Sequence, residues 1–310
     1  MITRADVEAA AARTAGRIRR TPMAQIELAG RVLDLKLEFL QHTGTFKARG
    51  AVNRIAGAAE RGELDPQVGI VVASGGNAGL ANAWAAAALG VPATVFVPTT
   101  APRVKVDRLR TLGATVVQRG TEYATAYAAA VEHAVGTGAV YCHAYDQPEI
   151  AAGAGTLGLE LLEQVDGGVD TVVVAVGGGG LMAGVAAAVE GAATVVGVEP
   201  ENAPTLHRAF AAGEPVDVAV SGVAADSLGA RRIGDIGWSV AVRTGVRPVL
   251  VTDDDIVAAR RLLWAEHRIV VEHGAAAALA ALQAGAYVPG DGERVCVVLC
   301  GANTDPADLH

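Results

Sequence analysis

One lysine lies where its side chain could act as a nucleophile, in the run Thr45-Phe46-Lys47-Ala48-Arg49-Gly50. The spacing of apolar residues predicts a helix over residues 45–61, so Lys47 falls in its first turn, where the helix dipole disfavours a cation. This position, together with burial beside Phe46, would favour the neutral amine. A neutral lysine amine can form a Schiff base with an aldehyde. The alternative is an ordinary surface lysine at a helix end.

Two glycine-rich segments could bind negatively charged groups. Four consecutive glycines lie between a predicted strand, residues 171–176, and a predicted helix, residues 181–189. Glycine lets backbone N–H groups approach an anion closely, and a helix N-terminus favours negative charge. The segment lacks the GxGxxG and Walker A patterns, and we interpret it as a phosphate-binding loop rather than a flexible turn. The residues of this loop are Gly177, Gly178, Gly179, Gly180 and Leu181.

The second segment precedes a predicted helix over residues 77–89. Its residues are Ser74, Gly75, Gly76, Asn77 and Ala78. Ser74 or Asn77 could simply cap the helix, but capping does not require two adjacent glycines. We therefore expect this segment to bind a ligand carboxylate through its backbone.

The elements that must position these segments alternate between strand and helix. Predicted strands cover residues 33–39, 69–73, 93–97, 114–118, 139–143, 171–176, 194–198 and 295–299. Helices are predicted between most of them, which indicates parallel sheets with helices on both faces. Loops at the carboxyl ends of such strands form ligand sites. In the first strand, apolar residues alternate with Asp34, Lys36 and Glu38, which predicts one solvent-exposed face.

The composition excludes several classes of protein. Of 310 residues, 51% are apolar and 19% are charged, so the chain is not intrinsically disordered. A formal net charge of −8 argues against a general binder of nucleic acids or anionic membranes. The uncharged stretch 171–189 is long enough to cross a bilayer as a helix, but the four glycines in its middle disfavour a helix there. With no signal peptide and three cysteines without zinc-site spacing, we expect a cytoplasmic protein.

A Schiff-base lysine and a phosphate-binding loop together indicate pyridoxal 5'-phosphate. The sequence resembles the serine/threonine dehydratase group of the fold type II, or tryptophan-synthase-β-like, pyridoxal-phosphate enzymes. Residues 45–51 resemble the lysine motif Ser-Phe-Lys-x-Arg-Gly-Ala, residues 74–77 the Ser-x-Gly-Asn loop, and residues 177–181 the tetraglycine loop. Further segments that have counterparts in the family lie at residues 145–148, 155–160, 199–201 and 274–282. The motifs occur in the family's order along nearly the whole chain.

The resemblance implies roles for individual residues. Lys47 would hold the cofactor and later remove the substrate's Cα proton, Phe46 would pack beside the pyridine ring, and Asn77 would bind the 3-oxygen. The phosphate would lie against residues 177–181, and the substrate carboxylate against residues 74–78. Cys300 would face the pyridine nitrogen, and Glu272 would lie near the ring.

Departures from the family pattern leave some roles open. Gly75 stands where serine racemases of this fold carry a catalytic serine, which favours elimination, but Ser227 could supply a proton to the opposite face. A structural cation is implied at Glu199, the Ala203 carbonyl and Thr205. A hydroxyl in place of a further carboxylate favours a monovalent ion there.

The resemblance predicts two doubly wound parallel-sheet domains. The small domain would comprise residues 48–140, inserted into a large pyridoxal-phosphate-binding domain of residues 1–47 and 141–310. We expect a homodimer without a C-terminal regulatory domain, and an ammonia-lyase that converts L-threonine, L-serine or a related β-hydroxy amino acid to a 2-oxo acid. The alternatives are a racemase or β-replacement synthase of the same fold, or a non-catalytic metabolite-binding protein.

Overall fold

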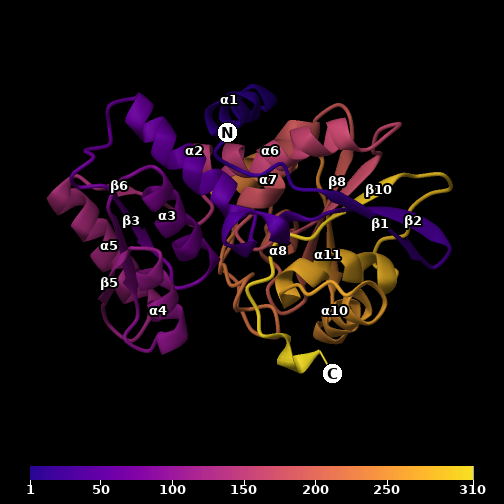
Figure 1. Cartoon of the computed structure of the whole chain (residues 1–310). Coiled ribbons are helices and arrows are strands. Elements are labelled where there is room, and N and C mark those ends of the chain that lie inside the picture. Colours follow the sequence, from indigo (N-terminus) through magenta and orange to yellow (C-terminus); the bar gives the residue numbers. More distant parts are fainter. Residues whose placement is uncertain (310) are drawn as a thin grey trace.

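Two β-sheets form the framework of the protein in the computed structural model, which describes residues 1–309 (Figure 1). The larger sheet has six strands in the order β1-β2-β10-β7-β8-β9. Its strands are β1 (Met23–Leu28), β2 (Arg31–Lys36), β10 (Val295–Val298), β7 (Thr171–Ala175), β8 (Thr194–Pro200) and β9 (Arg247–Val251). All neighbours pair in parallel except β1 and β2, which form an antiparallel hairpin.

Helices cover the larger sheet on both faces, as expected for an open parallel sheet. Figure 1 shows α6 (Pro148–Gln164) and α7 (Gly180–Val189) above it, and α10 (Asp253–His267) and α11 (His273–Gln283) below it. The central strand β7 is buried over its whole length, which its run of Thr, Val and Ala residues permits. The remaining helices of this part are α1 (Arg4–Thr14), α8 (Thr205–Ala212) and α9 (Asp235–Thr244).

The smaller sheet has four parallel strands in the order β5-β4-β3-β6. Its strands are β5 (Thr115–Gln118), β4 (Ala93–Val97), β3 (Ile70–Ala73) and β6 (Val140–Tyr141). Alternate residues of β3 contribute to two separate apolar clusters, so its two faces pack against different helices. The helices here are α3 (Asn77–Ala88), α4 (Arg103–Thr111) and α5 (Tyr123–Thr137).

Helix α2 (Lys47–Glu60) joins the two sheets, because it packs against α6 on one side and α3 on the other. Close packing against α6 requires a glycine on each helix. A Cβ on Gly50 would lie 2.6 Å from the Ile150 carbonyl oxygen, and a Cβ on Gly153 would lie 2.7 Å from the Gly50 Cα. The first residue of α2 therefore lies at the junction of the two sheets.

The structure confirms the predicted α/β class with parallel sheets and corrects several details. The first predicted strand ends at Lys36, and Lys36 and Glu38 are completely buried rather than solvent-exposed. Strands β1 and β9 and helices α8 and α9 were not predicted. Residues 171–189 form a strand, a glycine turn and a helix, as predicted, and no helix within residues 1–309 has the length and hydrophobicity needed to cross a membrane. The domain boundaries at residues 48 and 140 remain a prediction.

Candidate active site

The loop that carries Lys47 is attached to the end of strand β10. Thr45 forms an isolated antiparallel bridge with Gly301. The carbonyl oxygen of Cys300 accepts hydrogen bonds from the Phe46 N–H at 3.0 Å and from the Thr45 hydroxyl at 3.2 Å. Because α2 starts directly after these contacts, they fix the position of its first residue, Lys47.

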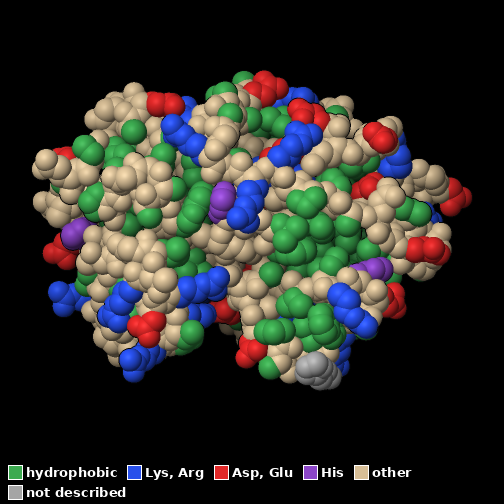
Figure 2. Space-filling model, viewed as in Figure 1, with side chains coloured by type: hydrophobic (Ala, Val, Ile, Leu, Met, Phe, Trp, Pro, Cys, Tyr) green, Lys and Arg blue, Asp and Glu red, His purple; other side chains and the backbone are tan. Residues whose placement is uncertain are grey.

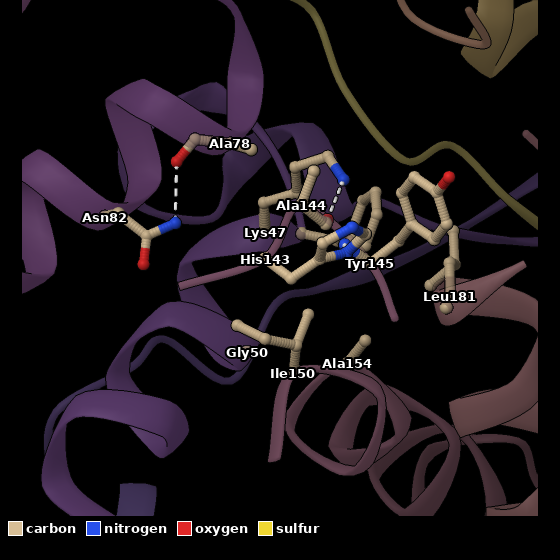
Figure 3. Close-up of a pocket in the computed structure, with 12 residues that line it drawn as sticks. Lys47, Gly50, Ala78, Asn82, His143, Ala144, Tyr145, Ile150, Ala154 and Leu181 are labelled. Atoms are coloured by element: carbon tan, nitrogen blue, oxygen red, sulfur yellow. Dashed lines mark hydrogen bonds between the residues drawn. The ribbon is translucent and has the colours of Figure 1, made fainter. Parts of the chain in front are cut away.

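The Lys47 amine is half-buried and makes no contact with a carboxylate among the described residues. Its Nζ donates a hydrogen bond to the Ala144 carbonyl oxygen at 3.0 Å and lies 5.0 Å from the centre of the Phe46 ring (Figure 3). Burial lowers the pKa of this amine, against an opposing effect of the Cys300 and Glu272 side chains. The structure thus gives the amine the environment that favours its neutral, nucleophilic form.

The other lysines of the chain have different surroundings. The sequence contains two besides Lys47, namely Lys36 and Lys105. Lys36 pairs with Glu160 at 2.7 Å, and Lys105 pairs with Asp226 at 2.5 Å. Burial lowers the pKa of Lys36 as well, but the Glu160 carboxylate opposes this effect from ion-pair distance. The Lys47 amine contacts no carboxylate among the described residues, so Lys47 is the best candidate for a nucleophile.

The glycine loop presents a row of backbone donors. Within residues 1–309, the N–H groups of residues 177–182 have no backbone or side-chain acceptor. They lie at the start of α7, where Gly179 adopts the left-handed conformation with φ +87°. Unpaired N–H groups at a helix N-terminus form an anion site, and the loop therefore fits a phosphate group.

Tyr145 explains why two positions of this loop cannot carry side chains. A Cβ on Gly178 would overlap the Tyr145 ring, and a Cβ on Gly180 would lie 2.6 Å from the Tyr145 carbonyl oxygen. Tyr145 is held in turn by His143, whose Nδ1 accepts hydrogen bonds from the N–H groups of Tyr145 at 3.2 Å and Asp146 at 2.8 Å. Burial lowers the pKa of His143, which is consistent with this acceptor role.

Lys47 and the end of the glycine loop, Gly180 and Leu181, line the same cavity (Figure 3). Lys47 and the Ala144 carbonyl lie on one side of it, and Gly180 and Leu181 contribute the start of α7. Its complete lining consists of Phe46, Lys47, Gly50, Ala78, Asn82, His143, Ala144, Tyr145, Ile150, Ala154, Gly180 and Leu181. An amine with a lowered pKa and an anion-binding loop at one cavity fit a cofactor that carries both an aldehyde and a phosphate.

Asn77, Glu272 and Cys300 form a second group near the amine. The Asn77 amide donates to the two carboxylate oxygens of Glu272 at 2.9 and 3.0 Å. Burial raises the pKa of Glu272, while the Asn77 hydrogen bond and Lys47 act in the opposite direction. Burial also raises the pKa of the Cys300 thiol, and the Glu272 carboxylate adds to this effect. Cys300 therefore remains a neutral thiol.

The predicted carboxylate-binding loop lies between β3 and α3. Its turn is closed by a hydrogen bond from the Gly76 N–H to the Ser74 hydroxyl at 3.2 Å. A Cβ on Gly76 would meet no atom of the described residues within 4 Å, so this side of the loop faces open space. The first N–H groups of α3, beginning at Asn77, point from a helix N-terminus, which suits a carboxylate.

Ser227 and the predicted cation site lie behind the glycine loop, where the Thr205 hydroxyl donates to the Gly177 carbonyl oxygen at 2.6 Å. Ser227 packs against Gly274, and its hydroxyl lies 3.4 Å from the Ala224 carbonyl oxygen. The buried Glu199 carboxylate accepts from the Thr205 hydroxyl at 2.9 Å and from the N–H groups of Leu206 and His207 at 2.7 and 2.8 Å.

Glu199 therefore caps the start of α8. The Ala203 carbonyl accepts from the Thr205 N–H at 3.1 Å. The cation itself stays a prediction.

Sequence reasoning did not single out three supporting residues. Tyr145 lies in the motif at residues 145–148, but nothing in the sequence indicates a role for its ring. Asn303 lies three residues after Cys300, and its side chain donates a hydrogen bond to Asn77. No local sequence pattern indicates this contact. Arg49 is completely buried, and its place in the lysine motif, two residues after Lys47, was the available signal.

Substituting Gly178 with alanine is expected to weaken the binding of pyridoxal phosphate by about tenfold or more, because the new Cβ displaces Tyr145 and with it the adjacent Ala144 carbonyl. Equilibrium dialysis of the apo-protein against the cofactor measures this effect. Gly136→Ala is the matched control, since Gly136 lies in α5 with no atom within 4 Å of its Cβ position. Equal affinity for the Gly178 variant and the control would contradict the assignment of the loop.

Known proteins are similar to this chain in sequence and fold. A family model described as pyridoxal-phosphate dependent enzyme matches residues 14–301. The L-threonine ammonia-lyase of Thermotoga maritima is 35% identical over 98% of this chain and 76% of its own length. The phenylserine dehydratase of Ralstonia pickettii is 39% identical over 90% of this chain and 85% of its own. Maize serine racemase superposes with a TM-score of 0.91 at 29% identity, covering 99% of this chain and 95% of the other. The chain therefore belongs to the pyridoxal-phosphate dependent enzymes, within the fold type II serine/threonine dehydratase group that its motifs resemble.

Proposed function

We propose that the protein is a pyridoxal-phosphate-dependent ammonia-lyase that converts L-threonine, L-serine or a related β-hydroxy amino acid to a 2-oxo acid and ammonia. One observation carries the proposal: the Lys47 amine, whose pKa is lowered by burial, lines the same cavity as the end of the glycine loop. Relatives named for L-threonine and phenylserine support this substrate class.

In this proposal, separate groups of the protein remove the proton and bind the cofactor and the substrate. Bound pyridoxal phosphate supplies an electron sink for negative charge at the substrate's Cα. Lys47 is the catalytic residue: its Nζ binds the cofactor and then removes the proton from Cα. The N–H groups of residues 177–181 hold the phosphate, and the start of α3 holds the substrate carboxylate.

The second group of residues would set the electronic state of the cofactor ring. Asn77 would donate a hydrogen bond to the 3-oxygen, Phe46 would pack beside the ring, and Glu272 would lie near it. Cys300 would face the pyridine nitrogen as a neutral thiol, because burial raises its pKa. A thiol leaves that nitrogen largely unprotonated and the ring a weaker electron sink, which suits prompt loss of a β-hydroxyl group over transamination.

The test is elimination by the purified holoenzyme. Ammonia and 2-oxo acid are measured with L-threonine, L-serine and phenylserine, and alanine serves as the control because it has no leaving group at Cβ. We expect equal amounts of both products from at least one β-hydroxy amino acid. Formation of a thiol amino acid from sulfide and an activated serine, with no 2-oxo acid from any hydroxylated substrate, would instead identify a β-replacement synthase.

Racemisation is the second candidate activity, and Ser227 is the observation that favours it. If the Ser227 hydroxyl delivers a proton to the second face of Cα, Ser227→Ala should abolish conversion of L-serine to D-serine while elimination falls less than about threefold. Chiral chromatography of both products measures the two rates in one sample. No D-serine from the unsubstituted enzyme, or D-serine formation that survives the substitution, would exclude this role.

The proposal extends to the assembly and its location. We propose a cytoplasmic homodimer in which a small domain, residues 48–140, is inserted into the large one, and in which a monovalent cation binds near Glu199. The three cysteines are buried and free, which is consistent with a reducing compartment. Sedimentation of the purified protein tests the dimer, and melting temperatures in potassium and tetramethylammonium chloride test the cation.

A further inference from the structure

Helix α4 of the smaller sheet contacts the opposite part of the molecule at two points. The Arg108 guanidinium donates to the Asn303 side-chain oxygen at 2.7 Å, and Lys105 pairs with Asp226 at 2.5 Å. Figure 2 shows a notch between the two parts of the molecule at the lower edge of the view, with basic side chains on the side where α4 lies. Both contacts therefore lie at the surface, between the two sheets.

The Arg108 contact continues inward through side-chain amides. The Asn303 Nδ2 donates to the Thr43 carbonyl oxygen at 2.9 Å and to the Asn77 Oδ1 at 2.7 Å. The Asn77 Nδ2 in turn donates to both Glu272 carboxylate oxygens, at 2.9 and 3.0 Å. A continuous series of hydrogen bonds thus joins a surface arginine to the candidate active site.

The two ends of this series, together with the Thr43 carbonyl, determine the direction of every bond in it. A guanidinium can only donate hydrogen bonds, and an ionised carboxylate can only accept them. Arg108 therefore requires the Asn303 oxygen to face α4, which places the Asn303 NH₂ group against Asn77. That contact turns the Asn77 oxygen outward and its NH₂ group toward Glu272. Rotating either amide by half a turn would place like groups against one another at both of its ends.

We propose that Arg108 is a positioning residue, which acts through Asn303 to fix the direction of the Asn77 amide. The inference rests on the proposed role of Asn77 as the donor to the 3-oxygen of the cofactor. Arg108 itself touches neither substrate nor cofactor. Without it, the Thr43 carbonyl alone holds the Asn303 amide in this orientation. The Asn303 NH₂ group is then held less firmly against Asn77, and the Asn77 donor is less firmly fixed in its direction.

The experiment compares Arg108→Met with the unsubstituted holoenzyme. We expect the kcat of elimination to fall about fivefold to tenfold with little change in KM, as for loss of one charged hydrogen bond that orients a catalytic group. The absorbance band of the bound cofactor should shift, because its 3-oxygen loses a fixed donor. Arg108→Lys, which retains a donor, should restore part of both effects.

Two readouts separate this inference from the proposed function. The affinity of the apo-protein for pyridoxal phosphate, measured by fluorescence titration, should fall about threefold to tenfold in Arg108→Met, whether or not the holoenzyme eliminates any substrate. In an Asn303→Ala background, Arg108→Met should have no further effect on affinity, since the two residues act as one unit.

Variants on the same helix complete the test. Arg110→Met is the matched control, because Arg110 is exposed and pairs with Asp107 within α4, so its affinity and absorbance should equal those of the unsubstituted protein. Lys105→Met breaks the other contact of α4 without touching Asn303. An equal shift of the cofactor band in Lys105→Met, or an unchanged band and affinity in Arg108→Met, would overturn the inference.

Discussion

Replacing Lys47 with alanine is expected to lower the rate of 2-oxo acid formation by about three orders of magnitude, because the substitution removes both the amine that binds the cofactor and the base at Cα. The fold should survive, since the Lys47 side chain makes a single hydrogen bond, to the Ala144 carbonyl. A dehydrogenase-coupled assay of the 2-oxo acid, with far-ultraviolet circular dichroism as the control for folding, measures the effect.

The small number of lysines makes the attachment site easy to identify. Borohydride reduction of the holoenzyme followed by peptide mass analysis should place the cofactor on Lys47, with Lys36 and Lys105 unmodified. Lys105→Ala is the matched control and should keep the cofactor attached. Reduced cofactor on another lysine, or 2-oxo acid formed at an undiminished rate by Lys47→Ala, would refute the proposed mechanism.

Replacing Arg49 with methionine should lower the free energy of unfolding by about 3–5 kcal/mol, the usual effect of removing one partner from a buried ion pair. The Arg49 side chain is completely buried, and it contacts Glu38 at 2.8 Å and Glu160 at 2.6 Å. Without the guanidinium, the buried Glu38 carboxylate has no cation at ion-pair distance among the described residues. Urea unfolding at a fixed cofactor concentration measures the change.

Arg54 provides a control for Arg49 on the same helix. It is mostly buried along its length, but its guanidinium lies 3.5 Å from Glu149 and 3.7 Å from Glu63, which is half-exposed. Arg54→Met should therefore change the free energy of unfolding by less than about 1 kcal/mol. If both variants lose equally little stability, the buried cluster does not hold the start of α2 in place.

The parts of the site that the sequence predicted are those with local signals. Four glycines between an apolar strand and a helix have few interpretations, and a lysine in the first turn of a helix conflicts with the helix dipole. The alternation of strand and helix was sufficient for the fold class, which the structure and its relatives confirm. The chemical roles of the individual residues stay predictions until the variants are measured.

The parts that sequence reasoning missed depend on contacts between distant segments. Lys36 and Glu38 alternate with apolar residues as on an exposed strand face, yet both are buried because Arg49 and Glu160 neutralise them. The contact from Arg108 to Asn303 joins residues 195 positions apart. Strand β9 contains Arg247 and Pro248, which weaken a strand pattern but are tolerated at the edge of a sheet.

The attachment of the lysine loop to β10 has a consequence for biosynthesis. Strand β10 lies between β2 and β7 in the larger sheet, although it is made last of the ten strands. A ribosome therefore releases Lys47 long before the segment that anchors it, and the sheet remains split until about residue 301 has emerged. The nascent chain cannot trap aldehydes in a finished cavity, because the reactive centre comes into existence only after residue 301 has left the ribosome.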